Sequence, residues 1–569
     1  MHQAVLELGK MMNNRTFLLS AIAAILIGVS TSVFAQEDPL RKYCPEGNCL
    51  EIGKKPKKAV KLYREVHVID EDEIPRRADW EGALYLPQSR LQDAMERLAD
   101  GGTIYLHKGE YDYNALSWRR RASFNIEAWS GDRVMLRPRA QCLFIDPVFH
   151  PRKDEPVITL KNLIIAPQSL LGESCIETEH AKLSLNNVEI DLSAVQGKRG
   201  VRVLSGELTV NGKGFKDTVV GEPTNEGVLV DPGATLVAEG ATFSGLKTGV
   251  HILPADGIVT YEEVDKISHF CNTRFESNTI GLMVDGVATV DNKTAACGKT
   301  AKKNKQTEGD DKADNNEQAY EGGYAKNNEQ ILCKEKILFE DGGVQLPNFA
   351  GNRVGVLVSG MAKIKDVTFY DNGAGIEASG RLAGTLRIDC SRFEGAGQSE
   401  VGVEIRAPEG AYGYAGNTKI AQSTFSGLYE AIVAAAGVEI GSANKFGLSS
   451  SVGIEEINFA SLPNKIAVKI PSGAVNSFYR IHDNEFHAND VSLSIADNFV
   501  GNLEFSGNTG ELRKGRKKRP SNNVLQINDP KSILIQECTI GTASLDLEFR
   551  HKKRGLGRVN NCRKGQQQR

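Results

Sequence analysis

The sequence predicts an all-β chain that folds as a right-handed parallel β-helix with a short N-terminal capping helix. Two observations carry this prediction. A phrase in which Phe precedes a Gly-Val-x-Val strand recurs along the chain. The composition is rich in Gly, with 57 residues, and only 7% of the residues are aromatic, which suits many short strands joined by tight turns.

The recurring phrase pairs a short Phe-containing segment with a following Gly-Val/Ile-x-Val/Ile strand. Each pair is one coil, and a coil buries its apolar face only by stacking on its neighbours, with strands about 4.8 Å apart. An all-β sandwich is the alternative, but its turns would not repeat this phrase at the spacing of a coil. Pairs of this kind start at Phe243 and Gly249, Phe275 and Gly281, Phe369 and Gly375, and Phe393 and Gly402.

The N-terminus has the organisation of an export signal. Arg15 precedes an apolar run over residues 17–33, and Val33-Phe34-Ala35 offers small residues at the positions that a signal peptidase recognises. We expect a signal peptide over residues 1–35; an uncleaved membrane anchor is the alternative. Residues 36–80 are polar and predict an extended arm.

A single amphipathic helix is predicted over residues 89–100 and ends at Gly101-Gly102. Thr103-Ile104-Tyr105-Leu106 and then Gly109-Glu110-Tyr111 follow it directly. This succession resembles the entry to pectate-lyase-like β-helices, a broad class of carbohydrate-binding and sugar-hydrolysing repeats. The resemblance implies that the helix caps the apolar end of the coil and that the first strands come next.

The β-helix is predicted over residues 81–550, with one interruption. Residues 291–335 are charged, poor in apolar side chains and without a period, which indicates a surface insertion. Residues 551–569 form a basic tail, and the nearby run 513–519 is also basic. Such runs can bind an anionic polymer or remain a solvated tail.

Ten cysteines in an exported chain predict disulfides. Cys44 and Cys49 suggest a local pair, and Cys297 and Cys333 bracket the insertion, whereas the other cysteines cannot be paired from sequence. A zinc site is not expected, because the chain has no CxxC or CxxH pair. We expect a periplasmic or secreted protein with no membrane span once the signal is removed.

The middle residues of the Gly-Val-x-Val strands should form one outward column, in the order Arg202, Leu229, His251, Met283, Leu357, Glu377, Glu404, Val433 and Glu455. Glu377 and Glu404 would then lie one strand spacing apart, where like charges raise one pKa. Such a pair could act as acid and base or hold a calcium ion. Arg406 shares that face and could neutralise an acidic sugar. Tyr412 and Tyr414 follow in a loop and could stack on a sugar ring, although the two glutamates could also be solvated surface residues.

Arg480 and His482 form a second candidate pair. If Ile481 points inwards, both side chains share the outer face. A histidine base beside an arginine suits abstraction of the proton next to a uronate carboxylate. The alternative is a polar surface turn.

These features lead to two hypotheses. The first is an enzyme, a lyase, epimerase or hydrolase acting on an acidic, uronate-rich polysaccharide. The second is a non-catalytic β-helix that binds glycan or a cell-envelope partner as a scaffold or adhesin. The resemblance carries no catalytic motif across: alginate epimerases of this fold have Asp-Pro-His-Asp, whereas this chain has only Asp146-Pro147-Val148-Phe149-His150. The formal net charge of −3 gives no whole-chain attraction to nucleic acid, which is not expected as a partner, and the oligomeric state stays open.

Overall fold

The computed structural model describes residues 61–74, 82–147, 154–218, 221–254, 267–292 and 347–378, and, with interruptions, residues 386–564. All described strands belong to one compact unit, Leu62–Arg569. The predicted signal peptide, Glu455, and the residues Tyr412 and Tyr414 lie outside the described residues, as do Cys44, Cys49, Cys297 and Cys333. In the part of the chain that the structure describes, no helix has the length and apolarity needed to cross a bilayer.

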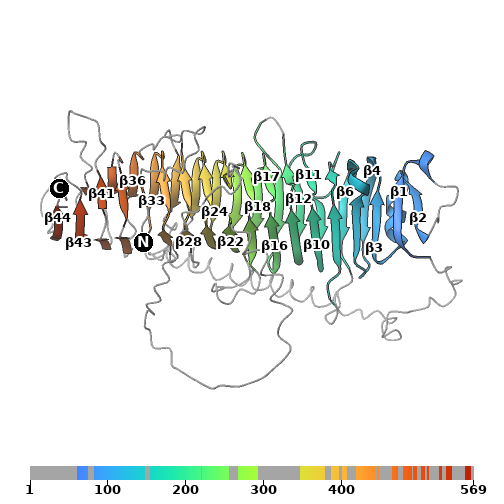
Figure 1. Cartoon of the computed structure of the whole chain (residues 1–569), viewed down its shortest axis with the longest axis horizontal. Helices are drawn as coiled ribbons and strands as arrows, with labels where there is room; N and C mark the ends of the chain where they lie inside the picture. The colour runs from blue at the N-terminus through green and yellow to red at the C-terminus, as the bar shows by residue number, and fades with distance from the viewer. Residues whose placement is uncertain are drawn as a thin grey trace, which may run out of the picture. The chain divides into compact units, whose positions relative to one another are not determined.

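The described strands form two sheets in which neighbouring coils pair in parallel, so the chain is the parallel β-helix that the sequence predicts (Figure 1). Each coil contributes one strand to sheet A and two to sheet B. In one coil, for example, β16 (Ala234–Glu239) lies in sheet A, and β17 (Thr242–Ser244) and β18 (Thr248–Ile252) lie in sheet B. The next coil repeats this order, with β19, β20 and β21.

Sheet A has 18 strands. In ladder order they are β2 (Leu84–Pro87), β1 (Tyr63–Ile69), β3 (Leu98–Leu106), β5 (Phe124–Ala128), β7 (Val157–Lys161), β10 (Ala181–Asn186), β13 (Gly206–Asn211), β16, β19 (Ser268–Cys271), β22 (Val287–Asp291), β25 (Met361–Lys365), β28 (Leu386–Asp389), β31 (Lys419–Ala421), β34 (Val438–Gly441), β37 (Phe478–His482), β40 (Asn502–Ser506), β43 (Ile533–Ile540) and β44 (Arg558–Lys564).

Sheet B has two columns that the long strand β6 (Val134–Ile145) joins, because it pairs with both β8 and β9 and, on its other side, with β4 (Gly109–Trp118). The short column contains β8 (Ile164–Ile165), β11 (Glu189–Asp191), β14 (Gly214–Lys216), β17, β20 (Arg274–Glu276), β23 (Phe349–Ala350), β26 (Thr368–Tyr370), β29 (Arg392–Glu394), β32 (Thr424–Ser426), β35 (Lys445–Phe446), β38 (Glu485–His487) and β41 (Thr509–Glu511). The long column contains β9 (Ser174–Thr178), β12 (Arg199–Val203), β15 (Glu226–Val230), β18, β21 (Ile280–Val284), β24 (Val354–Val358), β27 (Ala374–Ala378), β30 (Val401–Ile405), β33 (Glu430–Ala434), β36 (Ile466–Ile470), β39 (Val491–Ile495) and β42 (Leu525–Ile527).

The two ends of the sheet extend beyond the predicted boundaries. Strand β1 lies inside the segment expected to be an extended arm, yet it pairs with β2 and β3. Strand β44 lies inside the predicted basic tail and pairs with β43. The only sequence signal for β1 is the short run Val66-His67-Val68-Ile69, which is rich in β-branched residues.

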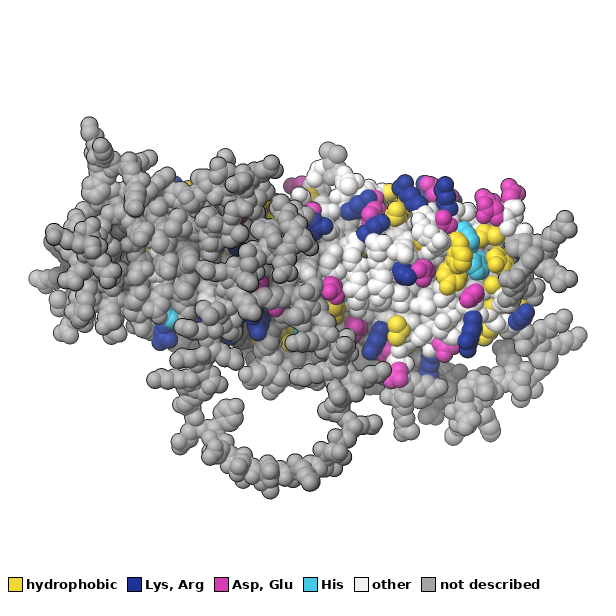
Figure 2. All heavy atoms as spheres, viewed as in Figure 1, with side chains coloured by type: hydrophobic (Ala, Val, Ile, Leu, Met, Phe, Trp, Pro, Cys, Tyr) yellow, Lys and Arg dark blue, Asp and Glu magenta, His cyan; other side chains and the backbone are white. Residues whose placement is uncertain are grey.

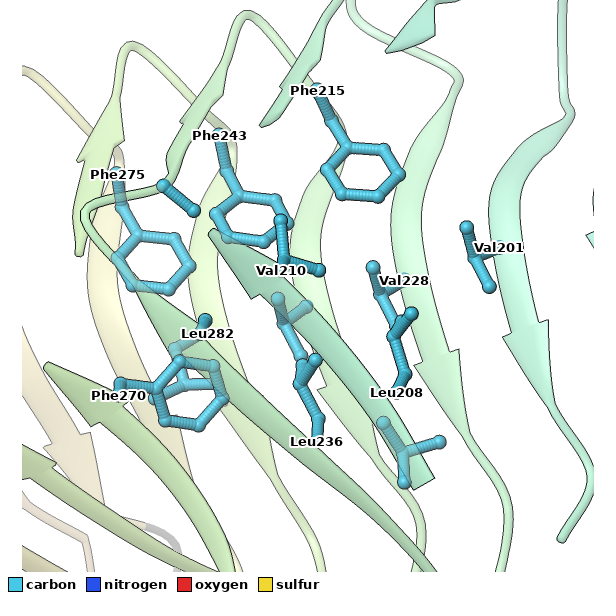
Figure 3. Close-up of a cluster of buried hydrophobic side chains, with 14 of the residues drawn as sticks. Val201, Leu208, Val210, Phe215, Val228, Leu236, Phe243, Phe270, Phe275 and Leu282 are labelled. Carbon is cyan, nitrogen blue, oxygen red and sulfur yellow. The ribbon is translucent and has the colours of Figure 1, made fainter. Parts of the chain in front are cut away.

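The Phe residues of the short column form a continuous stack from Phe215 to Phe425, and Figure 3 shows its first members. Neighbouring rings lie nearly parallel, with centroids 5.1 Å apart at Phe215 and Phe243 and 4.6 Å apart at Phe369 and Phe393. These rings are fully buried. Offset stacking of this kind adds to the free energy gained by burial of the rings.

The Phe stack explains the Gly of the repeat. A Cβ atom on Gly375 would lie 2.6 Å from the Gly402 carbonyl oxygen and 2.9 Å from Cδ1 of Phe393. The ring of the following coil therefore occupies the space in which a side chain would stand. The recurring pattern of Phe followed by Gly in the sequence therefore reflects this contact between adjacent coils.

The predicted helix is shorter than expected. A 3-10 turn, η4 (Gln88–Arg90), leads into α2 (Leu91–Glu96), which buries Leu91, Ala94 and Met95. Residues 98–100, predicted to be helical, instead begin β3, which pairs with β1. Two further 3-10 turns are η2 (Glu71–Glu73) and η5 (Trp129–Gly131).

Disulfides are present, as the sequence predicts. Cys142 of β6 and Cys175 of β9 are bonded between neighbouring coils, with Cα atoms 4.8 Å apart. Cys271 and Cys390 are also disulfide-bonded. The pairing of Cys142 with Cys175 depends on the register between coils, which the spacing of the two residues along the chain does not reveal.

Candidate functional site

The outward residues of the long column lie in the expected register up to β33. Glu377 of β27 pairs with Glu404 of β30, and Glu404 pairs with Val433 of β33. The next partner of Val433 is Lys469 of β36. The expectation that Glu455 follows Val433 is therefore wrong: the next strand of the column begins at Ile466, and Lys469 takes the position after Val433.

Arg406 brings the two glutamates together. Its Nη1 atom lies 2.9 Å from Oε1 of Glu377, and its Nε atom lies 3.1 Å from Oε1 of Glu404. Its Nη2 atom also donates to Oε2 of Glu404 at 3.2 Å. The Glu377 side chain is 15% exposed, Glu404 28% and Arg406 52%, so the guanidinium is fixed at the surface by two more deeply placed carboxylates.

The sequence places Arg406 on this face because it lies two residues beyond Glu404. Its backbone N–H donates to the Ala378 carbonyl oxygen, which extends the ladder past the end of β30. The hydrogen bond to Glu404 raises the pKa of Arg406, against partial burial and together with the charges of Glu377 and Glu404. The site thus contains two carboxylates that share one permanent cation.

This geometry does not fit a calcium ion at the glutamate pair. Calcium takes six to eight oxygen ligands, whereas a guanidinium already binds oxygen atoms of both carboxylates. No group of three or more His, Cys, Asp or Glu side chains suited to a metal ion occurs among the described residues.

Arg480 and His482 lie in β37 of sheet A, so the two predicted clusters belong to different sheets. Tyr479 and Ile481 are buried, which turns Arg480 and His482 outwards as predicted. In the ladder, Arg480 lies between Glu439 of β34 and Glu504 of β40.

Sequence analysis missed a polar network on the same column as Glu377. Nε2 of His251 lies 2.8 Å from Oδ2 of Asp285, and the Ser359 hydroxyl donates to Oδ1 of the same carboxylate. The hydrogen bond from His251 lowers the pKa of Asp285, against partial burial. The sequence places His251 in the outward column. Asp285, however, lies in the turn after β21 of the next coil, and Ser359 lies in the turn after β24.

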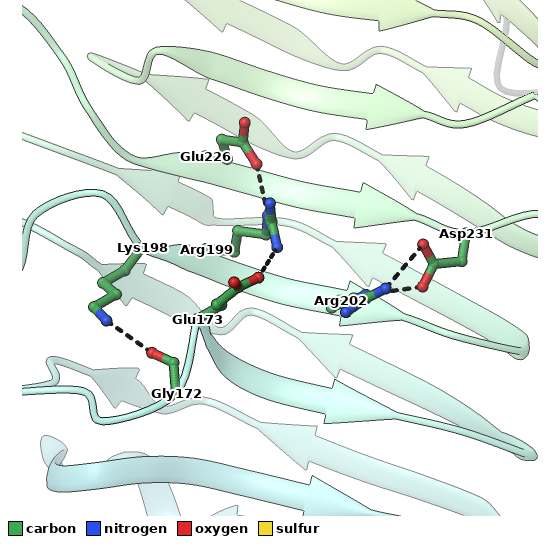
Figure 4. Close-up of polar contacts among 7 residues, drawn as sticks. All are labelled: Gly172, Glu173, Lys198, Arg199, Arg202, Glu226 and Asp231. Carbon is green, nitrogen blue, oxygen red and sulfur yellow. Dashed lines mark hydrogen bonds and ion pairs between the residues drawn. The ribbon is translucent and has the colours of Figure 1, made fainter. Parts of the chain in front are cut away.

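Polar side chains near the start of the column also contact partners in neighbouring coils (Figure 4). Arg202 donates from Nε to Asp231, which follows the next strand, at 2.8 Å. Three residues earlier in the same strand, Arg199 bridges Glu173 and Glu226 of the two flanking coils, at 2.8 and 2.7 Å. Charged side chains on this sheet therefore pair between coils. Arg406 differs because it binds two carboxylates that are direct neighbours in the outward column.

No family model and no curated protein matches this sequence. Solved structures that are similar to the chain include the following two. One is a mannuronic acid specific polysaccharide family 6 lyase from human gut microbiota, with a TM-score of 0.33 and 10% identity, covering 79% of this chain and 87% of that chain. The other is a PL6 alginate lyase in complex with a trisaccharide, with a TM-score of 0.34 and 11% identity, covering 84% and 85%.

Proposed function

We propose that this chain is an exported protein that acts on an acidic, uronate-rich polysaccharide by abstracting a proton, as a lyase or an epimerase. The observation that carries the proposal is the half-exposed guanidinium of Arg406, held between Glu377 and Glu404. Arginine binds a carboxylate through two parallel N–H groups. A uronate carboxylate is a suitable ligand for it.

The reaction follows from an exchange of partners at Arg406. When the uronate carboxylate binds the guanidinium, it displaces Glu404, the more exposed of the two glutamates. Glu404 then no longer binds the guanidinium and is free to accept a proton from the bound uronate.

Glu404 takes the C5 proton in this proposal, and Arg406 stabilises the charge that spreads into the uronate carboxylate. In a lyase, the electron pair of the broken C5–H bond forms a C4–C5 double bond, and the oxygen on C4 leaves and takes a proton from water. In an epimerase, C5 takes a proton from water on its other face, and Glu404 releases the first proton to solvent. Glu377 positions Arg406 throughout.

Hydrolysis, the third reaction considered from the sequence, fits this arrangement less well. A glycoside hydrolase needs one carboxyl group that is protonated before the reaction. Here both glutamates accept from the Arg406 guanidinium, so neither is placed to donate a proton to a glycosidic oxygen. The non-catalytic alternative also fits this site, since a uronate can bind Arg406 without reacting.

Export is part of the proposal. The Cys142–Cys175 disulfide suits an oxidising compartment, periplasmic or secreted. The apolar run at residues 17–33 is the segment that would direct it there.

The test uses the chain from residue 36 to residue 569 with alginate and with polygalacturonate. Ultraviolet absorbance of unsaturated uronate reports a lyase, and deuterium incorporation at C5 reports an epimerase. We expect turnover in one of these assays, and Glu404→Gln should lower it by about a hundredfold or more. Arg406→Ala should have an effect of similar size, because it removes the stabilising charge.

Arg202→Gln is the matched control, because Arg202 is an ion-paired arginine of the same outward column. It should leave turnover unchanged. The double variant Arg480→Ala, His482→Ala separates the two candidate clusters. Loss of turnover in that variant alone would move the site to sheet A, and saturable binding without turnover would establish the non-catalytic alternative.

A further inference from the structure

Five aromatic rings gather on the outer face of the first coils, and we call them the aromatic platform. His67 is the central member: it pairs with Tyr85 of β2 on one side and Tyr105 of β3 on the other. Its ring stacks on Tyr85 with centroids 4.8 Å apart and an interplanar angle of 12°, and lies 5.1 Å from Tyr105. His107 and Trp129 complete the platform.

These rings do not belong to the core. Val66 and Val68, on either side of His67, point inwards and are fully buried, so the platform lies on the opposite face of the same strands. Figure 2 shows hydrophobic and histidine side chains gathered on this face, at the end where Figure 1 places β1, β2 and β3. Apolar side chains exposed together on one face can mark an interaction site.

Trp129 presents the platform to solvent. Its indole stacks on His107 at 5.4 Å and 22°, and meets Tyr105 edge-on at 5.0 Å. It is nevertheless 40% exposed, which is unusual for a large hydrophobic side chain of the described residues. One face of the indole therefore rests on His107, and the exposed part of the ring is accessible to a ligand.

The turn that carries Trp129 is held in a costly conformation. Ser130 has φ 41° and ψ 40°, in the left-handed region that a serine rarely adopts. The Asp132 N–H donates to the Trp129 carbonyl oxygen at 2.8 Å and closes the turn. The indole is thus presented by a rigid turn, which reduces the entropy lost when a ligand binds.

The charge around the platform selects among ligands. Burial lowers the pKa of both histidines, that of His67 to about 4, with a smaller effect from His107. Asp132, which ends the turn that carries Trp129, accepts the Lys108 N–H through Oδ2 at 3.0 Å, and its carboxylate and that of Glu73 act on the pKa of His107 in the opposite direction. The rings are therefore uncharged and a carboxylate lies beside them, which disfavours a uronate.

We propose that the aromatic platform binds a neutral pyranose of a glycan, stacked on the open face of Trp129. The electron-rich face of an indole attracts the weakly positive C–H groups of a sugar ring. The Asp132 carboxylate, at the end of the same turn as Trp129, then accepts hydrogen bonds from the sugar hydroxyls. This site lies on sheet A and the Arg406 site on sheet B, so the inference does not depend on the proposed function.

Calorimetric titration of residues 36–569 with cellohexaose, mannohexaose and chitohexaose tests the proposal. We expect saturable binding of at least one of these neutral hexasaccharides. Trp129→Ala should weaken it by about tenfold or more, because the stacking surface is lost, and Trp129→Phe should restore part of the affinity. Tyr429→Ala, which removes a half-buried surface ring beside Lys465, should leave it unchanged.

Three results would overturn the inference. The first is no binding of any neutral hexasaccharide. The second is tighter binding of a hexauronate that Trp129→Ala abolishes, which would make the platform a uronate site. The third is self-association that Trp129→Ala abolishes, which would make the partner a second copy of the chain. Glu404→Gln should bind the neutral sugar normally, so failure of the catalytic proposal is distinguishable from failure here.

Discussion

Asn352 lies inside the coil stack, where its amide serves both neighbouring coils. Its Nδ2 atom donates to the Phe275 carbonyl oxygen at 2.9 Å and to Oδ1 of Asn372 at 2.9 Å. Its Oδ1 atom accepts from the Asn278 N–H at 3.0 Å. The residue is only 2% exposed, so water cannot replace these partners.

We expect Asn352→Ala to lower the free energy of unfolding by about 3 kcal/mol, because it leaves a buried carbonyl and a buried N–H without partners. Urea unfolding followed by circular dichroism measures the change. Asn125→Ala is the control, since the half-buried Asn125 amide makes one hydrogen bond, to Thr103, at 3.3 Å. It should cost about 0.5 kcal/mol or less, and equal losses in the two variants would contradict the buried-amide explanation.

Glycine lets the strands of the long column pack closely against the Phe stack. Gly375→Ala in β27 would place a Cβ atom 2.6 Å from the Gly402 carbonyl oxygen. We expect it to lower the free energy of unfolding by about 1–3 kcal/mol through overpacking. Its backbone is not left-handed, so the loss would be steric.

Gly172→Ala is the matched change, because the nearest atom to its Cβ would be the Ser174 carbonyl oxygen at 3.9 Å. Its backbone is not left-handed either, and the change should cost about 0.5 kcal/mol or less. Both variants are compared by thermal unfolding of the same chain. If Gly172→Ala were the more damaging change, close packing against the Phe stack would not be the reason for glycine in β27.

An element can be predicted from the sequence when the residues that specify it lie close together along the chain. The Phe-to-Gly phrase lies within one repeat, so the coils and the register of Glu377 with Glu404 could be predicted. The ladder partner of Val433 could not be predicted, because the strand that contains Lys469 begins further along the chain than the repeat indicates. The predicted helix was too long because β3 begins at Leu98, which pairs with Tyr63 of β1.

The candidate site shows the same limit. Arg406 was found because it lies two residues from Glu404 and shares its face. The His251–Asp285 contact was missed because its partners are 34 residues apart and meet only through the stacking of coils. The aromatic platform was missed for the same reason: His67, Tyr85 and Tyr105 come from three separate strands, and β1 itself was not predicted.

At the scale of the whole molecule, the coils on both sides of residues 293–346 pair directly with each other. Strand β21 pairs with β24 from Ile280 with Val354 to Val284 with Val358, and β22 pairs with β25. A stack of coils is stabilised chiefly by contacts between nearest neighbours. The intervening segment therefore adds a long connection without separating the two coils.

We predict that deletion of residues 300–330 changes the free energy of unfolding by about 1 kcal/mol or less, because the closure entropy of a loop depends only weakly on its length. The deletion keeps Cys297 and Cys333. Replacement of the same residues by a Gly/Ser segment of equal length is the control, and urea unfolding of both variants should match that of the parent chain. A loss of several kcal/mol in both would mean that this segment packs on the coils. A loss in the deletion alone would mean that the connection needs its length, so that in either case direct pairing of β21 with β24 would not suffice to hold the stack together.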